Sequence, residues 1–415
     1  MQELEPQQFY DKIFVARQPV FAADMRIWGY ELLFRQGETQ SAVFTDGDQA
    51  TTQVIADGYA LGTRGMGGGV RALFNFPRNV LIGAAPYVLP AERCVVEILE
   101  TVRPEAEVME ACRQLKDHGY VLALDDFVGE PGFEPLCEIA DIVKVDILGK
   151  TPTEVMAIVK GLRGYKARLL AEKVESPDMF TVCKRLGFTY FQGYFFSKPE
   201  VVPGRKLSAS QSTKIKLLKE LNESEAELSR LVEIIQTDLS ISYRLLKYIN
   251  SARFCLRGKI ESIQRAVNML GRQNLRQWLQ VVILSDINST DKGQELVRIS
   301  VLRARFLQLL AAVHPTPFPP DSMFVLGFFS VLDAILDQHM DQVLDEISLD
   351  PDIKDALIDS HGPNSAWLEL LQVLDQGRWD DLESKASRMG VPMRHIDSAA
   401  IEAALWTDEV MDGVS

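Results

Sequence analysis

Acidic side chains stand within or directly after several of the most apolar segments in the first half of the chain. Glu97 lies inside CVVEILE, Asp125 and Asp126 end YVLALDD, and Glu172 and Glu175 end LLAEKVE. Ionised carboxylates are costly to bury unless they are paired or bind a cation. If these acids converge, they predict a site for one or two hard divalent cations, of which Mg²⁺ or Mn²⁺ fits oxygen ligands best.

Other polar residues follow the same pattern. Lys144 and Asp146 lie in DIVKVD, and Gln192 follows FTYF. Taken singly, each polar residue is explained as well by a helix cap or by a salt bridge at the end of a strand. Neither explanation accounts for all of them together. We therefore expect them to meet in one functional site.

The segments that carry these residues alternate with stretches of helical periodicity between residue 13 and about residue 197. The apolar runs are IFVARQPVF, RALFNF, CVVEIL, YVLALDD, DIVKVDI, ARLLAEKV and FTYFQGYFF. Such alternation predicts parallel strands that are buried on both faces. A strand count near eight favours a TIM-like (β/α)8 barrel over an open sheet, and active sites of this fold lie at the carboxyl ends of the strands.

The second half of the chain has a different pattern. The segment PEVVPGRKLSASQS has the proline, glycine and serine content of a domain boundary. After it, segments such as SISYRLLKYINSA and NLRQWLQVVIL carry apolar residues three and four positions apart, as amphipathic helices do. We expect a barrel domain at residues 1–200, a linker at 201–212 and an all-helical domain at 213–415.

Composition excludes several classes of protein. The formal net charge of −14 argues against a general nucleic-acid binder or a protein of anionic membranes, because both need a positive field. The five cysteines are scattered and form no C-x-x-C pair, which fits a reducing compartment. No signal peptide begins the sequence, and no apolar run is long enough to span a bilayer. We expect a cytoplasmic protein.

The segment RIWGYELLFR resembles the signature of the EAL domain family of cyclic di-GMP phosphodiesterases. The resemblance covers about the first 200 residues and extends to FNF, VEILE, DDF, KVD, AEKVE and FQGYFFSKP. It implies a (β/α)8 barrel that hydrolyses cyclic di-GMP to the linear dinucleotide pGpG with the help of Mg²⁺ or Mn²⁺.

The resemblance also assigns roles to individual residues of this sequence. It implies metal ligation by Glu31, Asn75, Glu97, Asp125, Asp126 and Glu172. It implies catalytic roles for Lys144, Glu172 and Glu31. It implies contacts with the dinucleotide from Gln18, Leu33, Arg35, Asp146, Glu175, Gln192 and Pro199. Glu100 would anchor a loop at the site.

Three features depart from the family pattern. The signature has Leu32 in the place of alanine, and Lys173 stands where the family usually has glycine. The glycine-rich loop after the paired aspartates is replaced by VGEPGFEP at residues 128–135. These departures leave two functions open: a metal-dependent phosphodiesterase, or a catalytically degenerate barrel that acts as a cyclic di-GMP sensor or a protein-interaction module.

The run IIQTDLSISYRLLKYINSARFCLRGKIESIQRAVNMLGRQNLRQWLQVVIL resembles the HDOD domain, a helical relative of the HD-type metal phosphohydrolases. Ser330 and Val331 stand where those enzymes carry their His-Asp dyad. The resemblance therefore implies a non-catalytic domain that regulates the barrel or binds a signalling protein whose identity the sequence does not give. The whole chain resembles bacterial signalling proteins that join the two domains. EAL domains often dimerise, so a homodimer is a further expectation.

Overall fold

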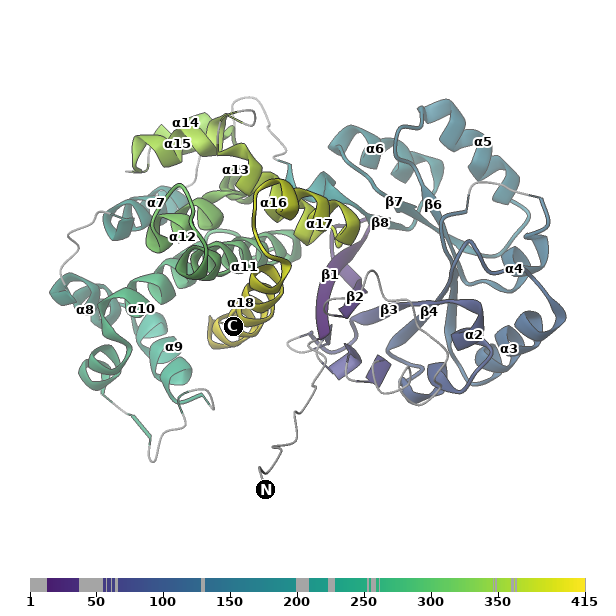
Figure 1. Cartoon of the computed structure of the whole chain (residues 1–415), viewed down its shortest axis with the longest axis horizontal. Coiled ribbons are helices and arrows are strands. Elements are labelled where there is room, and N and C mark those ends of the chain that lie inside the picture. Colours follow the sequence, from purple (N-terminus) through teal and green to yellow (C-terminus); the bar gives the residue numbers. More distant parts are fainter. Residues whose placement is uncertain are drawn as a thin grey trace, which may run out of the picture.

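The computed structural model of the chain describes residues 13–36, 66–127, 131–198, 209–222, 228–251, 262–345, 349–359 and 364–414, with short pieces at 55–56, 58–60, 62–63, 254, 259–260, 347 and 362. Figure 1 shows a strand barrel and a helical array side by side, with helices α16, α17 and α18 next to the barrel at strand β1. The expected combination of a (β/α)8-like barrel and a helical domain is confirmed.

Eight strands close into the barrel in the order of the sequence. Strand β8 pairs with β1 and so completes the circle. The strands are β1 (Ile13–Ala22), β2 (Ile27–Gln36), β3 (Arg71–Phe76), β4 (Cys94–Ile98), β5 (Val121–Leu124), β6 (Ile142–Asp146), β7 (Arg168–Glu172) and β8 (Tyr190–Gln192).

The first strand departs from the expected all-parallel arrangement. Strand β1 runs antiparallel to both of its neighbours, β2 and β8, whereas the other neighbouring pairs are parallel. The reason is the connection from β1 to β2, which consists of residues 23–26. A parallel crossover needs a dozen residues or more, so this connection permits only a hairpin.

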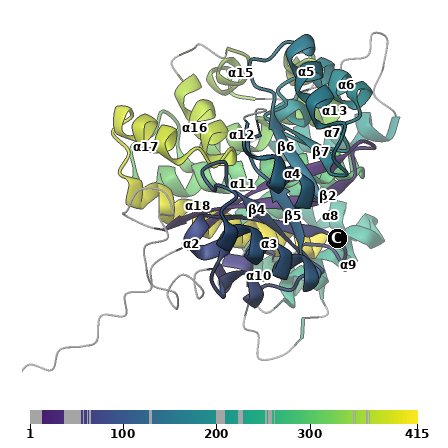
Figure 2. The same ribbon diagram turned by 90° about the vertical axis from the view of Figure 1, so that its right-hand side faces the viewer.

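Helices cover the outside of the barrel (Figures 1 and 2). Local signals fix their ends: Thr151 and Glu154 form a capping box at the start of α5, and Gly187 ends α6 in a left-handed conformation. The helices of this half are α2 (Arg78–Leu81), α3 (Ala106–Asp117), α4 (Glu134–Ile139), α5 (Pro152–Leu162) and α6 (Pro177–Leu186), with 3-10 turns η1 (Ala85–Val88) and η2 (Tyr194–Ser197).

The second half is helical throughout its described part. Its helices are α7 (Ala209–Asn222), α8 (Leu228–Thr237), α9 (Leu239–Ile249), α10 (Ile263–Ser285), α11 (Asp291–Val313), α12 (Pro320–Phe329), α13 (Leu332–Leu336), α14 (Met340–Asp345), α15 (Pro351–Ile358), α16 (Ser365–Asp375), α17 (Trp379–Arg388) and α18 (Met393–Val414). Helix α11 lies at its centre and packs against α10, α12, α13 and α18. None of the described helices is long and apolar enough to cross a membrane.

Gly193 holds the junction between β8 and η2 in a conformation that only glycine adopts readily, with φ 138° and ψ −174°. A Cβ there would also overlap the backbone N and O of Val174. We expect Gly193→Ala to lower the free energy of unfolding by about 3 kcal/mol or more, measured by urea denaturation. Gly187→Ala is the matched control, because its φ of 98° is also positive but its surroundings are open. That change should cost only about 1 kcal/mol. Equal losses would show that the contact with Val174 is unimportant.

Candidate functional site

The site is built as a polar layer on top of an apolar plug inside the barrel. The plug consists of Val20, Leu73, Val95, Ala123, Ile142, Leu170 and Tyr190. Side chains two positions apart on a strand face the same side. The residues two positions nearer the mouth of the barrel are therefore also inward-facing, and all of them are polar: Gln18, Asn75, Glu97, Asp125, Lys144, Glu172 and Gln192. Glu31 joins them from β2, where it pairs with Gln18.

Lys144 occupies the centre of this layer and is about 1% exposed. Its Nζ lies 2.7 Å from Glu97 Oε1, 2.8 Å from Asp125 Oδ1 and 2.9 Å from Glu172 Oε1. Glu31 Oε2 is slightly farther away, at 3.3 Å. Burial alone would lower the pKa of Lys144, but the four carboxylates reverse this effect and hold the pKa well above its ordinary value. The ammonium therefore stays charged at neutral pH.

Amide side chains orient Glu31. Asn75 Nδ2 donates to Glu31 Oε1 at 2.8 Å, and Gln192 Nε2 donates to Glu31 Oε2 at 2.6 Å. Gln192 Nε2 also donates to Gln18 Oε1 at 2.8 Å. Burial raises the pKa of Glu31, but Lys144 and these hydrogen bonds outweigh burial and lower the pKa overall. Glu31 is thus the carboxylate of the layer that is held most firmly in its ionised form.

The other acids of the layer behave in the opposite way. Burial raises the pKa of Glu97 and of Glu172 well above the usual range, and repulsion from Glu31 and Asp125 respectively adds to it. Burial also raises the pKa of Asp125. One ammonium is too little positive charge for four buried carboxylates. The layer therefore has a strong affinity for further positive charge, supplied either by protons or by a cation.

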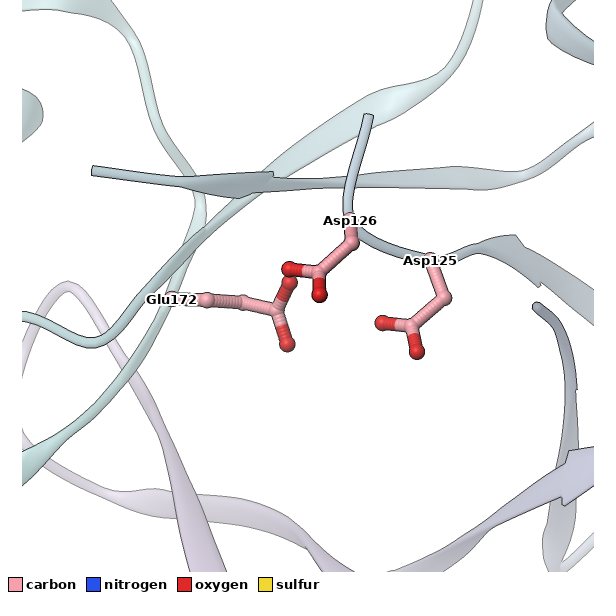
Figure 3. A group of neighbouring side chains, drawn as sticks. All are labelled: Asp125, Asp126 and Glu172. Atoms are coloured by element: carbon pink, nitrogen blue, oxygen red, sulfur yellow. The ribbon is translucent and has the colours of Figure 1, made fainter. Parts of the chain in front are cut away.

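The oxygen atoms of the layer fit a hard cation. Among the described residues of this layer, four buried oxygens have neither a hydrogen-bond donor nor an ion-pair contact with Lys144: Asn75 Oδ1, Glu97 Oε2, Glu172 Oε2 and Gln192 Oε1. Asp125, Asp126 and Glu172 each offer an oxygen within 4.8 Å of the others, and Figure 3 shows their carboxylates turned toward a shared space. Carboxylate and amide oxygens are the ligands that Mg²⁺ and Mn²⁺ prefer.

A cavity of about 430 Å³ opens beside this layer. Four acids of its lining, Glu100, Asp125, Asp126 and Asp146, form an acidic wall. Arg103 and Phe133 also line the cavity, and the guanidinium of Arg103 lies 4.7 Å from the centre of the Phe133 ring. Our sequence analysis singled out the four acids of this wall but missed Arg103 and Phe133. No pattern in the sequence indicates that these two residues contact each other.

Lys173 reaches into the acidic wall. Its Nζ lies 2.6 Å from Asp146 Oδ2 and 3.4 Å from Asp126 Oδ1. Its backbone has a φ of 54°, in the left-handed region where glycine is favoured. The position thus has glycine geometry, as expected from the glycine that the resemblance to EAL domains implies here, but it carries a cation next to one candidate cation ligand, Asp126, and one candidate nucleotide contact, Asp146.

The remaining residues expected at the site are placed less centrally. Glu175 is exposed, and no hydrogen bond or ion pair within the described part of the chain connects it to the layer. Leu33 packs against Gly377 of the helical domain. The side chain of Arg35, together with Pro199 and residues 128–130 of the altered loop, lies outside the described residues. Their expected contacts stay predictions.

In the helical domain, an arginine binds Ser330, one of the two residues that stand where HD-type phosphohydrolases carry their His-Asp dyad. Arg303 Nη1 donates to Ser330 Oγ at 2.9 Å, and its Nε and Nη2 bind Asp375 Oδ2 at 2.8 and 2.6 Å. Val331 is buried and apolar. A guanidinium repels a divalent cation, so this cluster of residues is unsuited to hold one.

Comparison with known proteins gives the two halves their families. A model of the EAL domain matches residues 75–199, and a model of the HDOD domain matches residues 207–353. The chain is 36% identical over 401 residues to the cyclic di-GMP phosphodiesterase CdgJ of Vibrio cholerae, covering 96% of this chain and 93% of CdgJ. It is 32% identical over 411 residues to YuxH of Bacillus subtilis, covering 97% and 99%.

Among solved structures, a standalone EAL protein of Vibrio cholerae O395 in its c-di-GMP-bound form matches with 24% identity and a TM-score of 0.36. The match covers 46% of this chain and 93% of that one. The class of protein is a two-domain chain with an acidic barrel site and a helical partner domain. The chain belongs to the family of proteins in which an EAL domain is followed by an HDOD domain.

The raised pKa values of Glu97 and Glu172 predict that the metal-free protein is least stable at high pH. Their stabilising contribution is complete below the ordinary value of 4.5 and is lost as pH rises through the folded-state pKa. In EDTA, the free energy of unfolding should fall above pH 4.5 by roughly 1.4 kcal/mol per pH unit for each proton that the folded state retains. Urea denaturation at several pH values measures this slope.

The control is the double variant Glu97→Gln and Glu172→Gln, whose amides do not titrate. Its slope between the same pH values should be much smaller than that of the original protein. Identical slopes in the two proteins would show that these carboxyls are ionised in the folded state.

Proposed function

We propose that the chain is a divalent-cation-dependent phosphodiesterase that hydrolyses cyclic di-GMP to pGpG, and that its helical domain modulates this activity. The observation that carries the proposal is the polar layer around Lys144, in which acids outnumber the single cation and buried oxygens lack donors. The relative CdgJ, which is similar over nearly the whole chain, is described as a cyclic di-GMP phosphodiesterase.

The proposed cation ligands come from several strands of the barrel. They are Glu31, Asn75, Glu97, Asp125, Asp126 and Glu172. When bound, Mg²⁺ or Mn²⁺ would supply Lewis acidity, lowering the pKa of a water and neutralising charge on the phosphodiester. Glu31 is ready for ligation without losing a proton, because its pKa is already low. Glu97 and Glu172 would release their protons on binding.

Lys144 and Glu172 carry the proposed chemistry of the chain itself. Lys144 keeps its proton because its pKa is raised, so its ammonium can donate hydrogen bonds to the attacking water or to the charge that develops on the phosphate. Glu172 lies 2.9 Å from Lys144 and offers an oxygen within 4.8 Å of oxygens of Asp125 and Asp126, which supports its proposed role as the acceptor of a proton from water. Glu31, which Asn75 and Gln192 hold in place by their hydrogen bonds, would in turn orient the ammonium of Lys144.

The proposed contacts with the dinucleotide surround this layer. They are Gln18, Leu33, Arg35, Asp146, Glu175, Gln192 and Pro199. Asp146 is supported by its place in the wall of the cavity, and Gln18 and Gln192 by their hydrogen bond at the edge of the layer. We further propose that the protein works in the cytoplasm, since Cys94, Cys112, Cys137 and Cys183 are free thiols.

Lys173 favours a second function, that of a cyclic di-GMP sensor without turnover. Its ammonium lies 3.4 Å from Asp126, where it competes with a cation for that ligand, and 2.6 Å from Asp146, a proposed nucleotide contact. A barrel that bound the nucleotide but held its cations weakly would transmit occupancy to the helical domain and then to a protein partner. Dimer formation is compatible with either function.

One assay separates the two functions. The purified full chain is incubated with cyclic di-GMP and Mn²⁺ or Mg²⁺, pGpG is followed by chromatography, and binding is recorded by calorimetry in Ca²⁺. Cation-dependent pGpG establishes the phosphodiesterase. Tight binding without product establishes the sensor, and neither result in any of the three cations would overturn both.

Removing a single carboxylate of the layer should abolish turnover. We expect Asp125→Asn and Glu172→Gln each to reduce kcat at least about 100-fold, because each removes a charged ligand or proton acceptor without changing shape. Asp141→Asn is the control, since Asp141 precedes β6 at the opposite end of the barrel and pairs with Lys116. Full turnover in both site variants would sink the proposed site.

Replacing Lys173 should strengthen cation binding. Lys173→Gly removes the competing charge and relieves the left-handed strain, and we expect it to raise Mn²⁺ affinity about tenfold in calorimetry. Lys173→Met keeps the strain but removes the charge, so it separates the two causes. If neither variant binds Mn²⁺ more tightly, Lys173 is no competitor.

A further inference from the structure

Helix α11 of the helical domain lies against the barrel through residues on one of its faces. This face carries Asp291, Glu295 and Arg298, which are three or four positions apart. The first two contact the barrel, and Arg298 binds Asp408 of α18. Asp291 Oδ2 accepts from the backbone N of Ile27 at 3.1 Å. Glu295 Oε2 accepts from the hydroxyl of Tyr30 at 2.8 Å, and Glu295 is about 3% exposed.

Tyr30 is the neighbour of Glu31 on strand β2. Side chains alternate along a strand, so Tyr30 faces out of the barrel toward α11 while Glu31 faces the polar layer. One peptide unit therefore joins the residue that the helical domain holds to Glu31.

The helical domain also contacts residues next to Gln18 on β1 and after Gln192 at the end of β8. Arg17, the neighbour of Gln18 on β1, binds Asp408 of α18 at 3.1 Å, and Arg298 of α11 binds the other oxygen of that carboxylate at 3.2 Å. Both Arg17 and Asp408 are almost fully buried. Gln18 is thus flanked by a contact to the helical domain in the same way as Glu31.

The third contact follows strand β8. Arg303 of α11 donates to the hydroxyl of Tyr194, and its guanidinium lies 6.0 Å from the centre of that ring. Tyr194 stands two residues after Gln192, across Gly193, whose close packing on Val174 leaves little freedom. Arg303 is itself fixed by Asp375 and Ser330.

The three flanked residues are the members of a single hydrogen-bond chain. Gln192 donates both to Gln18 and to Glu31, so these side chains share one donor group. Each lies one or two residues along the chain from a side chain that the helical domain holds.

We propose that the helical domain positions the edge of the barrel site through this chain. Three residues of the helical domain act as positioning residues. Glu295 holds Tyr30 and thereby sets Glu31. Asp408 holds Arg17 and thereby sets Gln18, and Arg303 holds Tyr194 and thereby sets Gln192. The inference rests on the proposed function only in taking Glu31 as a cation ligand. Any signal that shifts α11 relative to the barrel changes the geometry of that ligand.

The test uses the full chain with Glu295→Ala, which removes the acceptor of the Tyr30 hydroxyl. We expect Mn²⁺ affinity without nucleotide to fall about tenfold, as for residues that orient a metal ligand. Hydrogen exchange followed by mass spectrometry should show faster exchange at residues 29–33 and 190–193. If turnover is present, kcat should fall more than KM rises.

Three further variants make the result specific. Glu295→Gln keeps an acceptor oxygen and should restore most of the affinity. Tyr30→Phe removes only the hydroxyl and should match Glu295→Ala. Lys292→Met is the matched control, since Lys292 is on the same helix but pairs with Asp337 of the helical domain at 3.0 Å; it should leave Mn²⁺ affinity and exchange in the barrel unchanged.

The outcomes separate this inference from the proposed function. Unchanged exchange and unchanged Mn²⁺ affinity in both Glu295→Ala and Tyr30→Phe overturn the positioning role, even if the protein hydrolyses cyclic di-GMP. Faster exchange at residues 29–33 and 190–193 in these variants, but not in Lys292→Met, supports it even if no pGpG is formed. Hydrogen exchange needs neither cation nor nucleotide, so it decides the matter by itself if Mn²⁺ does not bind. An equal effect of Lys292→Met would show that the contact between Glu295 and Tyr30 only stabilises the fold in general.

Discussion

Four carboxylates share one buried ammonium inside the barrel, and the properties of the site follow from that imbalance. Lys144 lies within 3.3 Å of Glu31, Glu97, Asp125 and Glu172. Burying an unpaired carboxylate costs several kcal/mol, so the layer needs this lysine in order to fold. The lysine does not satisfy it completely, because two acids keep strongly raised pKa values and several oxygens lack donors. A divalent cation would supply both the missing positive charge and a partner for these oxygens.

The barrel makes this concentration of charge tolerable by its layered interior. Apolar side chains fill the barrel below the site, and the polar residues stand two positions farther along the same strands. Glu31, Glu97 and Glu172 are thus buried in protein, and Asp125 also borders the cavity. The outward faces of β1 and β2 and the turn after β8 meet the helical domain through buried polar contacts. The polar layer thus lies on the inner face of β1 and β2, and the interface with the helical domain lies on their outer face.

The fold class, the family and the grouping of the acids could be predicted from the sequence, for a physical reason. Amphipathic helices repeat their apolar residues about every 3.6 positions, whereas strands buried on both faces are short continuous apolar runs, so the sequence distinguishes the two. Polar residues within such strands are costly to bury, and their presence therefore indicates a site. The alternation predicts a parallel β1, and this prediction is wrong because residues 23–26 are too few for a parallel crossover. The contacts of Tyr30 with Glu295 and of Tyr194 with Arg303 could not be predicted. They join segments more than 100 residues apart, and no local periodicity encodes which helix faces which strand.

The most direct test of the account is to locate a cation in the barrel. Crystals of the full chain soaked in Mn²⁺ would be measured at a wavelength where manganese scatters anomalously. The account predicts an anomalous peak within coordination distance of carboxylate oxygens of Asp125 and Glu172, at the mouth of the barrel above Lys144. A map with no peak in the barrel at saturating Mn²⁺, or with a peak only outside it, would contradict the claim that this layer is a cation site.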